Sequence, residues 1–105
     1  MNKAKMINLM QFARKAGKLV SGYDATIRAL NRDLVYLVVT AEDSSERTLK
    51  NLQHALEPLK ARVKHLSFGS QTELAQALGL PDTAVFGVLD KNFAGKIVEY
   101  WQAED

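Results

Sequence analysis

Hydrophobic positions along the chain recur at helical spacing in some segments and form unbroken runs in others. Met6, Met10 and Ala13 lie about one turn apart, which predicts an amphipathic helix. The run LVYLVVT at residues 34–40 is continuous rather than alternating, which is typical of a strand covered by helices on both faces. The whole pattern predicts helices that begin after Asn2, near Gly22 and after Asp43, Ser70 and Asp90, and strands at 18–21, 34–40, 63–68 and 84–89.

Short polar residues and glycines mark the expected ends of these helices. A polar side chain at an N-cap accepts a hydrogen bond from a free amide of the first turn, and an acid three residues later completes a capping box. Glycine just after a helix permits the left-handed turn that ends it. The expected N-caps and capping boxes are Asn2, Ser21 with Asp24, Asp43 with Glu46, Ser70 with Glu73, and Asp90; the expected terminators are Gly17 and Gly79, and the third helix is expected to end near Pro58.

Helices that alternate with strands through short loops favour right-handed crossovers and layered α/β folds. We therefore predict a three-layer α/β/α sandwich with a small mixed, largely parallel four-stranded sheet, in which residues 34–40 form a central strand. The last helix places Phe93, Tyr100 and Trp101 on one face, which we expect to pack on this sandwich. With no internal repeat or linker, residues 1–105 are predicted to form one domain.

Composition excludes several classes of site. The chain has no cysteine, which excludes disulfides, thiolate nucleophiles and cysteine-ligated metals and fits a reducing compartment. Two histidines alone do not make a metal site. The N-terminal segment is interrupted by polar residues, and no apolar run reaches transmembrane length. We therefore expect a cytoplasmic protein without a metal, a cofactor or a membrane partner.

Positive charge is concentrated at the start of the chain. The net charge is only +2, but residues 1–32 contain a single acid, Asp24. Such asymmetry is consistent with an anionic partner, but the charge taken alone favours a solvated basic face. The cations of this segment are Lys3, Lys5, Arg14, Lys15, Lys18, Arg28 and Arg32.

Two enzymatic interpretations find little support in the sequence. Gly17 and Gly22 have the spacing of a phosphate-binding loop, but the lysine and hydroxyl residue that should follow are absent. A hydrolase would need Ser44 or Ser45 beside a base such as His54, yet no nucleophile-elbow motif occurs. We therefore expect a protein that is not an enzyme.

The segment between the first two helices fits contact with nucleic acid. Gly17 and Gly22 allow close approach of the backbone, and Lys18 and Arg28 flank a helix start with free N–H groups. An alternative remains open, in which Gly17 only ends one helix and Gly22 only permits tight packing.

The order of elements and three segments of sequence resemble one ribosomal-protein family. The segments are ARKAGKLVSGYDATIRAL, LVVTAEDSSERT and GSQTELAQALG. Together they resemble the family of archaeal L7Ae, eukaryotic L30e and Gadd45, and within it the small bacterial proteins of the YlxQ type. The resemblance implies an α/β/α sandwich that binds kink-turn RNA, a helix–bulge–helix element with tandem sheared G·A pairs at a sharp bend.

The resemblance also implies which residues contact the RNA. The family motif Gly-x-Asn-Glu-x-x-Lys falls on Gly22 to Arg28, where Asp24 replaces Asn and Ala25 replaces Glu. The expected groove contacts are Lys18, Gly22, Asp24 and Arg28, with Leu80 of the segment GLPDTA on the bulged nucleotide and with Arg14 and Lys15 attracting phosphates.

The expected partner is therefore structured RNA, of a kink-turn, ribosomal or riboswitch-like kind, bound by a monomer with no DNA partner. A protein-interaction or stress-regulatory module of the Gadd45 type is the main alternative, and an RNA-anchoring domain for a methyltransferase is a third.

Overall fold

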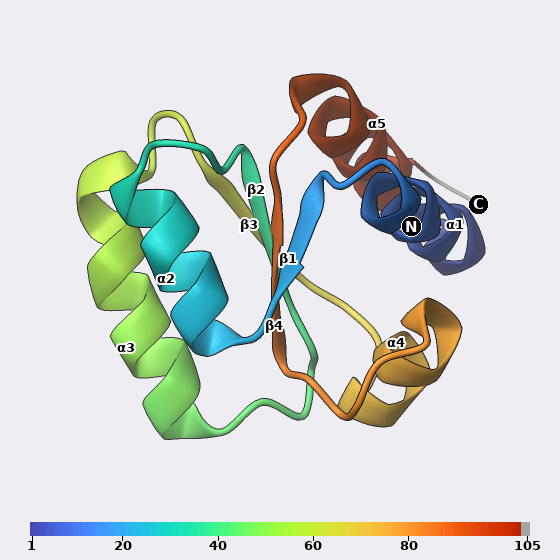
Figure 1. Ribbon diagram of the computed structural model, residues 1–105, viewed down its shortest axis with the longest axis horizontal. Helices are drawn as coiled ribbons and strands as arrows, with labels where there is room; N and C mark the ends of the chain where they lie inside the picture. Colours follow the sequence, from blue (N-terminus) through green and yellow to red (C-terminus); the bar gives the residue numbers. More distant parts are fainter. Residues whose placement is uncertain (104–105) are drawn as a thin grey trace.

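The computed structural model describes residues 1–103, so residues 104–105 of the expected domain lie outside the described part. Helices and strands alternate along the chain, as predicted (Figure 1). The elements are α1 (Lys3–Lys15), β1 (Leu19–Ser21), α2 (Tyr23–Asn31), β2 (Leu37–Thr40), α3 (Glu46–Leu56), the 3₁₀ turn η1 (Glu57–Leu59), β3 (Lys64–Ser67), α4 (Gln71–Leu78), β4 (Val85–Val88) and α5 (Lys91–Gln102).

The predicted three-layer α/β/α sandwich is confirmed. The four strands form one mixed sheet in the order β1-β4-β2-β3. Helices α2 and α3 cover one face of this sheet, and α1, α4 and α5 cover the other (Figure 1). Within the described residues, no helix is long and apolar enough to cross a membrane.

The expectation that the sheet is largely parallel is wrong. Only β2 and β3 pair in parallel, whereas β4 runs antiparallel to both of its neighbours, β1 and β2. The chain crosses from β2 through α3 to its parallel neighbour β3. It then returns past β2 and inserts β4 between β1 and β2. Alternation of helices and strands does not determine that insertion.

The two inner strands build a separate core on each face. All residues of β2 and β4 are buried, which confirms that the continuous apolar runs predicted doubly covered strands. Val38 and Val85 belong to the core under α2 and α3, while Val39 and Phe86 belong to the core under α1, α4 and α5. The strand predicted from residue 34 begins only at Leu37.

The helix ends are capped partly as predicted. Asn2, Ser70 and Asp90 each accept a hydrogen bond from an amide of the following first turn, at 3.2, 3.0 and 2.9 Å. Gly17 and Gly79 have φ values of +72° and +69°, which confirms both as left-handed terminators.

Two predicted caps are wrong. Gly22, not Ser21, is the N-cap of α2, and no side chain accepts a hydrogen bond there. Ser45, not Asp43, caps α3 by accepting from the amide of Thr48 at 3.1 Å. The Asp43 carboxylate instead accepts from the amide of Gln71 at 2.9 Å, because the fold brings the start of α4 beside this loop.

The aromatic residues of α5 pack against the core, as expected. Ile97 is fully buried, and Phe93, Tyr100 and Trp101 are partly buried against the core under α1, α4 and α5. The rings of Trp101 and Phe68 lie 6.5 Å apart between their centroids.

Candidate nucleic-acid interface

Three connecting segments meet at one end of the sheet. They are the β1–α2 junction at Gly22, the β2–α3 loop at 41–45 and the α4–β4 loop at 79–84, all at the bottom of Figure 1. The Gly22 amide donates to the carbonyl of Val85 at 2.8 Å, which joins the β1–α2 junction to the start of β4. The Ala41 amide donates to the carbonyl of Ala84 at 2.9 Å, which joins the other two segments. We call this surface the loop edge.

Gly22 has a backbone conformation that only glycine adopts readily. Its φ and ψ are +98° and 154°, and a side chain there would be strained although no heavy atom lies within 4 Å of a built Cβ. The strain therefore arises from the backbone rather than from crowding. Because no side chain caps α2, the first-turn amides of this helix lack a side-chain acceptor.

Helix α2 presents its polar residues next to Gly22. Asp24 and Arg28 lie one turn apart, and both are exposed. Ala25 is half-buried and lines a groove of about 670 Å³ together with Arg28 and Arg32. The position where the family motif has a glutamate therefore faces a groove with two cations.

Leu80 and Pro81 of the α4–β4 loop differ in their exposure to solvent. Leu80 is partly buried against the core under α1, α4 and α5, and its amide donates to the carbonyl of Ala75 at 2.9 Å. Pro81 and Asp82 are exposed. The Asp82 carboxylate accepts from the hydroxyl of Thr72 at 3.1 Å, which connects the loop tip to α4. The exposed apolar surface of this loop therefore includes Pro81.

The β2–α3 loop is held by its own hydrogen bonds. The Ser44 hydroxyl donates to the carbonyl of Ala41 at 2.6 Å, and the Glu42 carboxylate accepts from the amide of Gly69 at 3.0 Å. With Asp43 bonded to the start of α4, these polar residues have structural roles. His54 is exposed on α3, and the described structure contains no hydrogen bond between it and Ser44.

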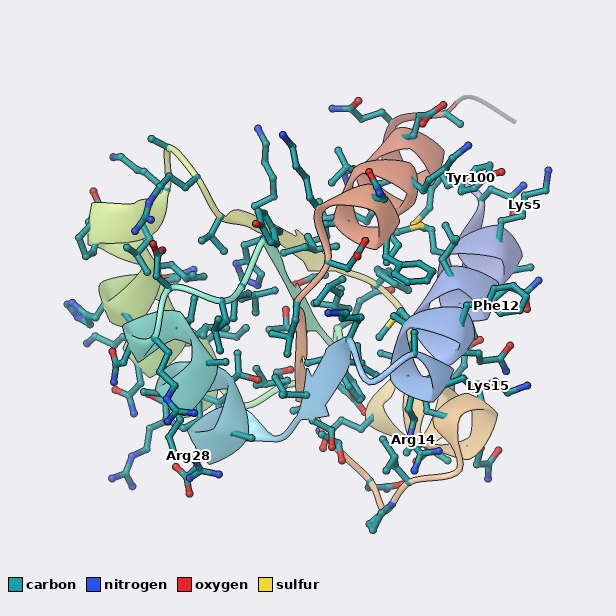
Figure 2. All side chains as sticks on the ribbon, turned by 45° about the horizontal axis from the view of Figure 1, so that its top comes forward. Lys5, Phe12, Arg14, Lys15, Arg28 and Tyr100 are labelled. Atoms are coloured by element: carbon teal, nitrogen blue, oxygen red, sulfur yellow. The ribbon has the colours of Figure 1, made fainter. Side chains whose placement is uncertain are left out.

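The predicted cations do not gather in one place. Figure 2 shows Arg28 on α2 and Arg14 with Lys15 on α1, on opposite sides of the sheet. Arg14 Nη1 donates to the carbonyl oxygen of Leu78 at 2.6 Å, so this side chain caps the end of α4 and adds a positive charge there. Lys15 is exposed.

Lys18 is also exposed, but the structure does not bring it to the loop edge. It precedes β1, and its carbonyl accepts from the amide of Leu89 at 2.8 Å. Gly22 follows the other end of the same strand. Of the predicted site residues, the structure therefore brings Gly22, Asp24 and Leu80 to the loop edge, with Arg28 one turn further along α2.

Burial changes the pKa of His65. It is half-buried on β3, its Nε2 lies 2.9 Å from the Thr40 hydroxyl, and burial lowers its pKa below the ordinary value of 6.5. Its place in the sheet suits a structural role. Among residues 1–103, no cluster of three metal-ligating side chains occurs.

Phe12 is not among the contacts predicted from the sequence. This side chain is 59% exposed on α1, beside Lys15 in a groove that α1 forms with the end of α4. A signal was present in the pattern, because position 12 lies off the buried stripe made by Met6, Met10 and Ala13.

Residues 4–98 match the model of the ribosomal protein L7Ae/L30e/S12e/Gadd45 family, and the chain belongs to this family. Two relatives carry the name RNA-binding protein YlxQ. The one from Enterococcus faecium is 34% identical over 98 residues, which cover 93% of this chain and 92% of the relative. The one from Bacillus subtilis is 30% identical over 90 residues, which cover 86% and 88% of the two chains.

Solved structures agree with the fold. A protein of unknown function from Bacillus halodurans superposes with a TM-score of 0.88 at 25% identity, over 95% of this chain and 99% of that one. The 15.5 kD RNA-binding protein of Giardia lamblia has a TM-score of 0.75 at 22% identity, over 92% of this chain and 81% of that one.

Proposed function

We propose that the protein is an RNA-binding protein without enzymatic activity, and that its loop edge recognises RNA of the kink-turn type. The observation that carries the proposal is the uncapped start of α2 at Gly22, in a glycine-only conformation beside the α4–β4 loop. The family of the chain and the printed names of its curated relatives support RNA as the partner.

The geometry of the loop edge suits a sharply bent RNA. Because Gly22 has no side chain, the backbone reaches the RNA groove closely, and free amides at the start of α2 donate to phosphate or base oxygens. The Asp24 carboxylate accepts from the amino and imino hydrogens of guanine in the sheared pairs. Leu80 and Pro81 offer apolar contact to an unstacked bulge nucleotide.

The cations divide between two roles in this proposal. Arg28 is on α2, next to the groove contact, and binds a phosphate close to the bend. Lys15 and Lys18 lie away from the loop edge and attract the flanking RNA over a longer distance. The protein acts as one monomeric RNA-binding domain, ribosomal or ribosome-associated, with no DNA partner.

A binding titration tests the proposal. The purified protein is titrated with a standard kink-turn and with a matched RNA whose sheared G·A pairs are replaced by Watson–Crick pairs. We expect tight binding to the first and a loss of about tenfold or more with the second. Equal affinity for the two RNAs would exclude recognition of the bend. No binding to either RNA, together with a 260/280 nm absorbance ratio typical of protein without nucleic acid, would favour the protein-partner alternative.

A further inference from the structure

The outer face of α1 has an unusual composition for a helix that packs against a core. The helix contains four cations and no acid in its sequence KAKMINLMQFARK. Its buried side chains are Met6, Met10 and Ala13, whereas the exposed stripe on the other side contains Lys5, Asn8, Phe12 and Lys15, at helical spacing. Figure 2 shows Lys5, Phe12 and Lys15 on the side of α1 that faces away from the sheet.

Phe12 is the most exposed of the large apolar side chains among the described residues, at 59%. Asn8 and Lys15, one turn away on either side, are exposed, and α1 has no other exposed large apolar side chain, so Phe12 does not form part of an extended apolar patch of the kind that a protein partner would bury. Lys3 pairs with Glu73 of α4, but the helix itself contains no acid, and Lys5 and Lys15 are exposed on the face that carries the ring. An exposed ring beside such cations instead matches the chemistry of nucleic acid, in which bases stack and phosphates need positive charge.

A groove of about 330 Å³ runs beside this ring. It is lined by Gln11, Phe12, Arg14, Lys15, Ala77 and Leu78, between α1 and the last turn of α4. Two hydrogen bonds fix its walls: Gln11 Nε2 donates to the carbonyl of Ala77 at 2.9 Å, and Arg14 Nη1 donates to that of Leu78 at 2.6 Å. The groove therefore exists before any ligand binds.

The groove lies next to the loop edge, because Arg14 on its α1 wall is near Gly79, the first residue of the α4–β4 loop. Its α4 wall ends at Leu78, and the α4–β4 loop that carries Leu80 begins directly afterwards. A nucleotide strand that leaves Leu80 therefore meets the groove next. At the far end of α1, Lys5 lies over the ring of Tyr100, 5.3 Å from its centroid, and extends the positive stripe.

We propose that the outer face of α1 is a second RNA-contact surface, which binds a single-stranded segment continuing from the RNA element at the loop edge. Phe12 stacks on a base of this segment, and Lys15 and Lys5 contact its phosphates. The proposal rests on RNA binding as proposed above, but it assigns this contact to a separate surface with its own test.

Three RNA probes separate the two surfaces. The first is a standard kink-turn with blunt ends. The second is the same kink-turn with an unstructured adenosine- and uridine-containing extension, placed on each strand end in turn and long enough to cross the 31 Å length of the molecule. The third is the extension alone, as a free oligonucleotide at low salt.

The variants are matched by chemistry. Phe12→Ala removes the ring and Phe12→Trp retains a stacking surface, while Tyr36→Ala removes another exposed aromatic ring, which is on the chain segment before β2. Lys15→Gln removes one cation of the stripe, and Lys50→Gln removes an exposed cation from α3, on the opposite side of the sheet.

We expect the extension, on one of the strand ends, to tighten binding of the wild-type protein. Phe12→Ala should remove about tenfold of that gain in affinity. The same substitution should leave the affinity for the blunt kink-turn unchanged. Phe12→Trp should restore the gain, and Tyr36→Ala should not affect it. Photo-crosslinking from 4-thiouridine in the extension should modify the tryptic peptide at residues 6–14, which contains Phe12.

Each other outcome decides a different question. Binding of the blunt kink-turn with no gain from either extension, or with the same gain in Phe12→Ala, would overturn the α1 proposal and leave kink-turn recognition intact. Binding of the free oligonucleotide that depends on Phe12, without binding of the kink-turn, would support the α1 surface and overturn the proposed function. Binding of none of the three probes would overturn both.

Discussion

Thr26 of α2 lies directly over Gly87 of β4. A Cβ atom built on Gly87 would lie 3.4 Å from Thr26 Cγ2 and only 2.9 Å from Val20 Cγ2. Thr26 is fully buried, so α2 approaches the sheet closely at this point. Gly22 is the N-cap of this helix and Asp24 lies in its first turn, so the close approach at Gly87 also helps to set the position of the loop edge.

The first prediction concerns this close approach. Gly87→Ala should lower the free energy of unfolding by about 1–3 kcal/mol, because the added methyl group overpacks against a β-branched side chain that cannot move away. Urea denaturation measures the change. Gly95→Ala is the control: Gly95 lies within α5 with no atom near its built Cβ, so this substitution should stabilise the protein by up to about 1 kcal/mol.

The second prediction separates backbone strain from RNA contact at Gly22. Gly22→Ala should cost about 1–3 kcal/mol of stability, because φ is +98° there. It should also abolish kink-turn binding, measured well below the melting temperature so that the variant is folded. Gly17→Ala places a similar strain at φ +72°, away from the loop edge. If both variants lost affinity alike, the effect of Gly22 would come from the fold and not from RNA contact.

The third prediction uses the departure from the family motif. Asp24→Asn combined with Ala25→Glu should strengthen kink-turn binding by about 1–3 kcal/mol, because a neutral acceptor and a second acceptor on α2 restore a bidentate base contact. Isothermal titration of the double variant and the parent against one kink-turn measures the difference. Weaker or equal binding by the double variant would mean that the loop edge reads RNA in another way.

The fourth prediction concerns phosphate contacts. The affinity for the blunt kink-turn should fall with a log–log slope against salt of roughly −2 to −4, because a few phosphates are neutralised by Arg28 and nearby cations. Arg28→Gln should reduce the magnitude of that slope by about one. Lys50→Gln, on the helix beside α2, serves as the control for net charge. An affinity indifferent to salt would contradict the phosphate contacts.

The fifth prediction is a pH dependence of stability that arises at His65. Burial lowers its pKa in the folded protein, so the unfolded chain takes up this proton at a higher pH than the folded chain does. The contribution of neutral His65 to stability is complete above pH 6.5 and is lost as the pH falls below that value. His65→Gln should therefore flatten the fall of the urea midpoint between about pH 7.5 and about pH 5. His54→Gln, at an exposed position on α3, is the control for the removal of an imidazole.

Local signals in the sequence predicted the helices and strands. Features that depend on contacts between distant residues could not be predicted in this way. The capping pair Ser70 and Glu73 was predictable because both partners lie within one turn. The cap at Asp43 was not, because three polar residues compete at 43–45 and the true partner of Asp43 is the amide of Gln71, 28 residues away. The antiparallel insertion of β4 likewise depends on contacts across the sheet rather than on neighbouring residues.

The candidate site shows the same limit. The motif at Gly22 to Arg28 could be located by resemblance, and the structure brings its first residues to the loop edge. A charge count could not show that Arg14 caps α4 or that Lys18 lies away from Gly22. Both features depend on how α1, β1 and α4 are placed. Phe12 could be identified as a candidate contact only because it is an aromatic residue that lies off the buried stripe of its helix.

The single tryptophan gives this fold an internal reporter for one of its two cores. Trp101 packs near Phe68 on the side of the sheet covered by α1, α4 and α5, so its fluorescence follows that side, while the circular dichroism of the helices follows both. Because β2 and β4 contribute side chains to both cores, loss of one core should also destabilise the other. Fluorescence and dichroism should therefore change at the same denaturant concentration, which is the behaviour of a single cooperative unit.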